Sequence, residues 1–124
     1  MSSRPIIKPY SVITDGDMSG NITSDVTIIQ NLSMISYDIS WSGTSPVGAL
    51  SVQISNTYSI DPGGAVKNAG NWTTLTLSAS ANVSGNTGNG AIDIDATGFY
   101  AIRLVYTRTS GSGTMQAVLN AKVM

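Results

Sequence analysis

The clearest indication of the fold class of this chain is the stretch FYAIRLVYTRTSGSGTMQAVLNAKV at residues 99–123. Apolar and polar residues alternate in two runs that flank the Gly-rich segment SGSG at 110–113. The residues expected to share the inward face are Tyr100, Ile102, Leu104 and Tyr106 in the first run, and Met115, Ala117, Leu119, Ala121 and Val123 in the second. Alternation on both sides of a Gly-rich turn predicts an antiparallel β-hairpin.

The same pattern recurs earlier in the chain. Residues 33–41 and 49–55 alternate on either side of a connection at 43–48 that contains Pro46, which predicts a second hairpin. Residues 22–29, 72–77 and 91–95 predict further short strands, and no segment shows a helical period. We therefore expect an all-β protein, an antiparallel β-sandwich or jelly roll of about 7–8 strands.

Composition narrows the possible functions. The chain has 124 residues, enough for one domain with a real core, and only 10% of them are charged, with no glutamate. A net charge of −1 and scattered cations argue against nucleic-acid binding, and no apolar run is long enough for a membrane span. Because histidine and cysteine are both absent, the usual general base, thiol chemistry and the commonest metal ligands are missing. We expect neither an enzyme nor a bound cofactor.

Two segments stand apart from the predicted strands. Residues 1–20 are interpreted as an extended N-terminal arm ahead of a sandwich domain at 21–124, because Pro5 and Pro9 oppose helix and confine any strand to an edge. The arm has apolar anchors, and two placements stay open: against its own sandwich or against a neighbouring subunit. Residues 56–71 are predicted to form a long surface loop, the kind of segment that often carries function.

Two acidic motifs could carry chemistry. Asp15, Asp17 and Ser19 match the opening of a calcium loop, but the glutamate required at its end is replaced by Val26, so a plain turn is favoured. Asp93 and Asp95 project from one face of a short strand, as a carboxylate pair for acid–base catalysis would. A solvated strand face explains them more simply.

The aromatic residues could form a sugar-stacking platform or simply pack in the core. They are Tyr37, Trp41, Tyr58, Trp72, Tyr100 and Tyr106. Most of them fall at alternating inward positions, which favours core packing, and Tyr58 in the predicted loop is the best exception.

Three stretches of the chain resemble a module that recurs in virion proteins of tailed phages. They are SVQISNTYS at 51–59, NWTTLTLSASANVSG at 71–85, and GAIDIDATGFYAIRLVYTRTSGSGTMQAVLNAKV at 90–123. The opening SRPIIKPYSVITDGDMSGNITS at 3–24 resembles small free-standing phage structural proteins. These motifs are turns and core positions, and none is catalytic.

The resemblance implies a capsid decoration, or cement, protein. Such a protein would bind the major capsid protein at the outer surface of the phage head, and the resemblance also implies a homo-oligomer, a trimer or a dimer. It would be made in the bacterial host cytoplasm and reside in the virion. The arm and the long loop are then the expected partner-binding segments, with Arg4, Pro5, Ile6, Ile7, Lys8, Tyr10, Tyr58 and Asp61 as the candidate contacts.

A second hypothesis is that the chain is a receptor- or carbohydrate-binding module of a tail fibre or baseplate. Such a module would expose aromatic side chains on loops. Tyr58 is its candidate contact. A third hypothesis is a hydrolase with Asp93 and Asp95 as its catalytic carboxylates.

Overall fold

The computed structural model of the chain describes residues 6–29, 32–75, 81–94 and 99–123. Its strands are β1 (Ile6–Asp17), β2 (Ile22–Thr23), β3 (Thr27–Ile28), β4 (Leu32–Ser55), β5 (Ser59–Ile60), β6 (Val66–Asn68), β7 (Thr73–Thr74), β8 (Ala81–Val83), β9 (Thr87–Ile94) and β10 (Ala101–Val123). Every pairing between them is antiparallel, and the described residues contain no helix, hence none that could cross a membrane. The prediction of an all-β antiparallel fold is confirmed.

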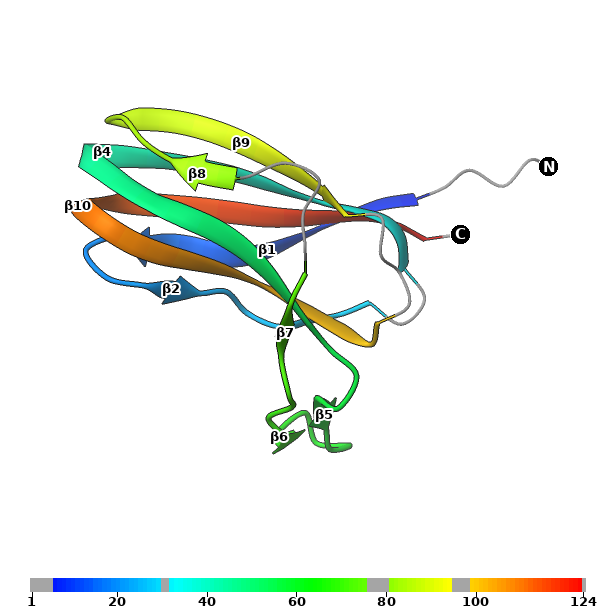
Figure 1. Cartoon of the computed structure of the whole chain (residues 1–124). Coiled ribbons are helices and arrows are strands. Elements are labelled where there is room, and N and C mark those ends of the chain that lie inside the picture. Colours follow the sequence, from blue (N-terminus) through cyan, green and yellow to red (C-terminus); the bar gives the residue numbers. More distant parts are fainter. Residues whose placement is uncertain (1–5, 30–31, 76–80, 95–98, 124) are drawn as a thin grey trace.

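Two long strands, β4 and β10, run through the whole molecule. They pair with each other from Ala101 opposite Ser55 to Val123 opposite Leu32. Strands in globular proteins usually have about 3–10 residues, whereas β10 has 23 and β4 has 24. Both turn back on themselves together at one end of the molecule (Figure 1).

Both predicted hairpins are therefore wrong. Tyr106 pairs with Leu50 and Met115 pairs with Trp41, so the two runs of β10 pair with β4 and not with each other. A two-residue type I′ hairpin turn needs positive φ at two successive residues, and in the segment 110–113 only Gly111 has one, at 78°. The Gly-rich segment bends a continuous strand.

The bend is made by a bulge in each strand. β10 has one extra residue between Arg108 and Ser110, and β4 has one extra between Thr44 and Val47, so the register is restored beyond the corner. Ser45 and Gly111 have positive φ at these bulges. The two backbones approach so closely that a Cβ at Gly111 would collide with the Ser45 carbonyl oxygen.

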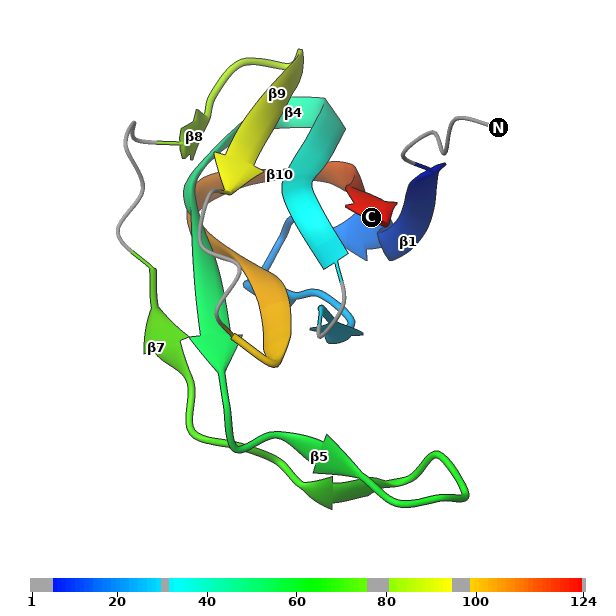
Figure 2. The same cartoon turned by 90° about the vertical axis from the view of Figure 1, so that its right-hand side faces the viewer.

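The corner divides each long strand between two layers, which together make a sandwich (Figure 2). One layer contains β1, the second half of β10, the first half of β4, and β9, in that order. The other contains the first half of β10 and the second half of β4, flanked by β2 and β3 on one side and by β7 and β8 on the other.

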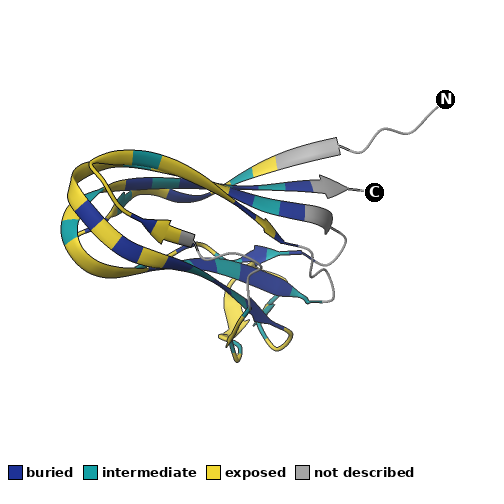
Figure 3. Cartoon of the chain, turned by 45° about the horizontal axis from the view of Figure 1, so that its top comes forward, coloured by how far each residue is buried: buried dark blue, intermediate teal, exposed yellow. Residues whose placement is uncertain are grey.

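The core lies between these layers, and in the long strands its residues are mostly those expected from the alternation, although Trp41 and Tyr100, just ahead of β10, are only half-buried. Met18 and Val83 are also buried, at positions where the sequence pattern did not predict core residues. Each bulge shifts the inward-facing positions of its strand by one residue. The buried apolar side chains of both halves of each long strand therefore face the core. Figure 3 shows the resulting alternation of buried and exposed residues along the long strands. The fully buried side chains include Tyr37, Ile39, Val52, Ile102, Leu104, Tyr106, Met115 and Leu119. Burial raises the pKa of the Tyr37 hydroxyl far above its usual value.

The segment expected to be an arm is part of the sheet from Ile6 onward. β1 pairs with β10 from Ile6 opposite Val123 to Asp17 opposite Thr114, with two irregularities on the way. The segment thus lies against its own sandwich, one of the two placements left open by the sequence. The domain boundary at residue 20 stays a prediction.

We predict that Gly111→Ala lowers the free energy of unfolding by about 2–4 kcal/mol, because the new Cβ meets backbone in a left-handed conformation. Denaturant unfolding measures the change. Gly20→Ala is the matched control, since nothing lies within 4 Å of a Cβ at that position, and it should change stability by less than about 0.5 kcal/mol. Equal stability of the two variants would contradict this explanation of the corner.

Candidate functional site

Residues 56–71 form a two-stranded hairpin that projects from the sandwich, and we call this segment the projecting hairpin. It begins directly after β4, contains β5 and β6, and leads into β7 (Figures 1 and 2). Its two strands pair Ser59 with Asn68 and Ile60 with Val66. The predicted surface loop is thus an ordered element.

The tip of the projecting hairpin is held by Asp61. The carboxylate oxygen Oδ1 of Asp61 accepts hydrogen bonds from the N–H of Gly63 at 2.9 Å and of Ala65 at 3.0 Å. The Asp61 N–H donates to the Ala65 carbonyl oxygen, and the Asp61 carbonyl oxygen accepts from the Gly64 N–H. Asp61, a candidate partner contact, therefore has a structural role in this turn.

The base is fixed by side-chain hydroxyls and amides. Ser55, which is 3% exposed, accepts hydrogen bonds on Oγ from the N–H groups of Thr57 and Tyr58. The Thr57 hydroxyl accepts from the Asn71 N–H at 2.7 Å, which ties the two ends of the hairpin together. Asn56 Oδ1 accepts from the Tyr100 N–H, which anchors the hairpin next to β10.

An aromatic and a guanidinium group pack beside this base. The Arg103 guanidinium lies 4.2 Å from the centre of the Trp72 ring, and Arg103 Nε donates to Gln53 Oε1 at 2.8 Å. Trp72 Nε1 donates to the Ala69 carbonyl oxygen, and the Tyr58 ring lies 5.9 Å from the Trp72 ring at a tilt of 53°. Partial burial lowers the pKa of Arg103, which as an arginine still carries its charge at neutral pH. Together these contacts brace the projecting hairpin against the sandwich.

Two apolar side chains are exposed on this braced element. Ile60 is 40% exposed and Val66 is 57% exposed, and because they are cross-strand partners they lie on the same side of the hairpin. A rigid hairpin that presents paired apolar side chains suits protein binding, because little chain entropy is lost when a partner covers them. Sequence reasoning missed this pair. The segment Asp61-Pro62-Gly63-Gly64, which lies between two apolar residues, is a turn signal that could have predicted this hairpin.

The other candidate contacts lie on β1 or outside the described residues. Arg4 and Pro5 are outside them, and the backbones of Ile6, Ile7 and Lys8 pair with β10. Tyr10 is half-buried and packs against the core. Tyr58 and Asp61 lie in the projecting hairpin, away from β1, so the structure does not bring the six described candidates together as one site.

The acidic residues of the motif at 15–19 form hydrogen bonds with neighbouring groups of the protein. Asp17 Oδ1 accepts hydrogen bonds from the hydroxyl and the N–H of Ser19, and these bonds lower the pKa of the Asp17 carboxyl. Asp15 exchanges hydrogen bonds with the Gln116 amide. Among the described residues, no three acidic, histidine or cysteine side chains gather as metal ligands would. Asp93 is exposed on β9, and Asp95 lies outside the described part of the chain.

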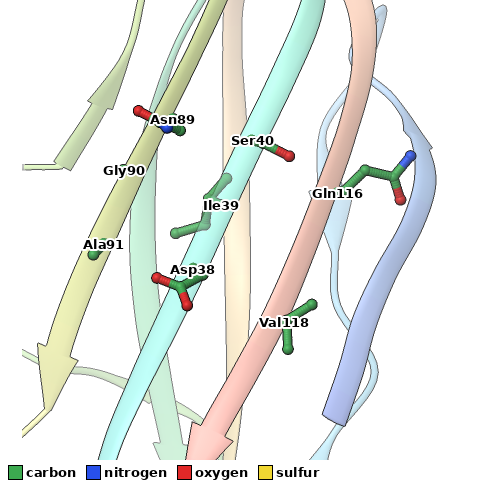
Figure 4. Close-up of a pocket in the computed structure, with 8 residues that line it drawn as sticks. All are labelled: Asp38, Ile39, Ser40, Asn89, Gly90, Ala91, Gln116 and Val118. Atoms are coloured by element: carbon green, nitrogen blue, oxygen red, sulfur yellow. The ribbon is translucent and has the colours of Figure 1, made fainter. Parts of the chain in front are cut away.

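A shallow depression of about 490 Å³ lies on the outer face of the layer that contains β9 and β1. It crosses β9, β4 and β10, and its lining residues are Asp38, Ile39, Ser40, Asn89, Gly90, Ala91, Gln116 and Val118 (Figure 4). Asp38, whose Oδ2 accepts a hydrogen bond from Asn120 Nδ2 at 2.8 Å, is the one charged residue that lines it. This lining offers no pair of groups for acid–base chemistry.

At the level of sequence, no family profile and no curated protein matches the chain. Solved structures do match its fold. A chain in a crystal structure of the T13 particle of infectious bursal disease virus has a TM-score of 0.56 at 14% identity, and one in a structure of the Gx strain of that virus has 0.53 at 16%. Both matches cover 98% of this chain and 32% of the viral chain, so this chain spans about a third of the viral chains it matches.

The SPBc2 prophage-derived protein YomS is also similar, with a TM-score of 0.49 at 11% identity over 97% of both chains. The identities are low throughout, and the likeness is one of fold. The chain thus has a β-sandwich fold that also occurs in a virus particle.

We predict that Trp72→Ala loosens the projecting hairpin and leaves the sandwich folded, because it removes the ring that contacts Arg103 and Tyr58. Trypsin cleavage after the exposed Lys67 should become about tenfold faster, since cleavage reports local opening. Thr74→Ala, at an exposed position in β7, is the control and should leave the rate unchanged. Equal rates in both variants would show that the ring does not brace the hairpin.

Proposed function

We propose that this chain is a structural virion protein of a tailed phage that decorates the capsid, and that it attaches through the projecting hairpin. The observation that carries the proposal is the exposed pair Ile60 and Val66 on a hairpin whose tip and base are both fixed. The likeness to a chain of a virus particle supports a structural role in an assembly of this kind.

The proposed partner is the major capsid protein at the outer surface of the head, and the proposed location is the virion, after synthesis in the bacterial host cytoplasm. Covering Ile60 and Val66 removes apolar surface from water, which favours binding. Each such contact is small, but attachment of an oligomer at several points of the shell gives strong overall binding.

The N-terminal segment is a weaker candidate for attachment than the projecting hairpin, because from Ile6 onward it forms β1 of the sandwich. A deletion of residues 1–10 removes the pairing of Ile6 to Tyr10 with β10, so loss of attachment in that variant would also reflect loss of stability. Point substitutions on the projecting hairpin avoid this difficulty, because its exposed side chains can change without loss of sheet pairing.

We expect Ile60→Asp and Val66→Asp each to weaken binding to capsids by about tenfold or more, because a carboxylate replaces apolar surface at the contact. Co-sedimentation with purified heads that lack the protein measures binding. Thr107→Asp adds the same charge at an exposed position on β10 and should bind like the parent chain. Full binding by both hairpin variants, with unchanged melting temperatures, would contradict the proposed attachment surface.

The second candidate function is a receptor- or carbohydrate-binding module of a tail fibre or baseplate. The observation in its favour is the half-exposed aromatic pair Tyr58 and Trp72 beside Gln53 and Arg103. It predicts binding on a glycan array that is lost in Tyr58→Ala. No binding by the parent chain, together with binding to heads, would exclude it.

A further inference from the structure

We propose that β9 is an interface between two copies of this chain, which pair edge to edge and antiparallel about a two-fold axis at Ala91. This pairing belongs to the isolated chain and does not depend on capsid attachment. If it fails, the proposed attachment through the projecting hairpin is unaffected, because that contact is tested separately with the hairpin variants.

The first observation is that β9 is an open edge. Among the described residues β9 pairs only with β4, in an unbroken register from Thr87 opposite Ser42 to Ile94 opposite Ile35. Within the described part of the chain, its outer side therefore presents a row of unpaired backbone groups, which is a template for another strand.

The second observation is the contrast with β1, the opposite edge of the same layer. β1 contains Pro9 and two irregularities, which are common ways to prevent edge-to-edge association. β9 has the sequence TGNGAIDI, with no proline, lysine, arginine or bulge. One edge of this layer is protected and the other is open.

The third observation is that side chains do not block the open edge. Gly88 and Gly90 carry none, Ala91 is small, and Ile92 and Ile94 point into the core of their own chain. Figure 4 shows the Asn89 amide directed away from β4, toward the side from which a second strand would approach, where the amide can form a hydrogen bond with that strand. A second strand can therefore approach closely.

One register gives complementary contacts. With the axis at Ala91, Asn89 of each copy lies opposite Asp93 of the other, so an amide donor meets a carboxylate twice. Ile92 of the second copy then lies next to Gly90, where a Cβ would have nothing within 4 Å and the space is open. An axis at Asp93 would instead place two carboxylates opposite each other, which is unfavourable.

A second copy is the occupant that these features favour. The pairing is isologous, as in most dimers, because the same strand supplies both sides and the polar pair is self-complementary. It would extend the layer across the axis as β1–β10–β4–β9 followed by β9–β4–β10–β1 of the second copy.

Cross-linking tests the axis directly, since the chain contains no cysteine. Ala91→Cys places two thiols opposite each other across the axis, within the Cα separation that a disulfide spans. Under mild oxidation, Ala91→Cys should form covalent dimers at least about tenfold faster than Asp93→Cys, whose thiols would lie roughly four residues apart along the strand direction. Ser40→Cys, exposed on β4, controls for random collision. Equal rates for the three variants would overturn the proposal.

A charge exchange tests the register without a covalent bond. Asn89→Asp puts carboxylates opposite each other twice, so we expect the dimer to dissociate about tenfold more readily. The double variant Asn89→Asp, Asp93→Asn has the parent's net charge and restores both pairs, so it should recover parental association. Analytical ultracentrifugation up to millimolar chain measures these equilibria. A parent chain that stays monomeric throughout, or a double variant no better than Asn89→Asp, would overturn the proposal.

Discussion

The pairing of β4 with β10 is the interaction on which the rest of the structure depends. Both strands pass through both layers, and all other strands of the sandwich pair with one or the other. The corner at Ser45 and Gly111 lets the pair fold back without losing its register. Since a bulge in each strand shifts the inward positions by one, the two halves can bury their apolar faces against each other in one core.

The same pairing positions the proposed functional surfaces. β4 ends at Ser55, whose hydroxyl accepts hydrogen bonds from the first residues of the projecting hairpin. β10 supplies Arg103, which packs on Trp72 at the base of that hairpin. The first half of β4 also carries β9, whose outer side is the open edge. The proposed attachment surface and the proposed self-association edge are thus held by opposite halves of one strand.

The sequence predicted the burial pattern better than the connectivity. Leu104, Tyr106, Met115 and Leu119 are buried as expected, because period-two alternation depends only on which face meets the core. A break in that alternation at a Gly-rich segment is common to a hairpin turn and to a bulged corner, so alternation alone could not show that β10 is continuous. That distinction depends on a partner strand roughly 60 residues away in sequence, as in the pairing of Tyr106 with Leu50.

The sequence predicted which segment lies at the surface, but it did not predict which of its side chains form the proposed contact. Residues 56–71 do project, but Asp61 holds the turn, while Ile60 and Val66 are the exposed apolar pair. Exposure of these two depends on how far the hairpin extends beyond the sandwich, which no local pattern encodes. The packing of Arg103 on Trp72 likewise joins residues that only the folded sheet brings together.

The most direct test of the continuous β4–β10 pair is a set of backbone proton contacts measured by NMR. We expect contacts across the ladder on both sides of the corner, between Leu104 and Val52 and between Leu119 and Tyr37. Two separate hairpins would instead give contacts between residue 106 and residues 115–118, and that result would contradict the continuous pair.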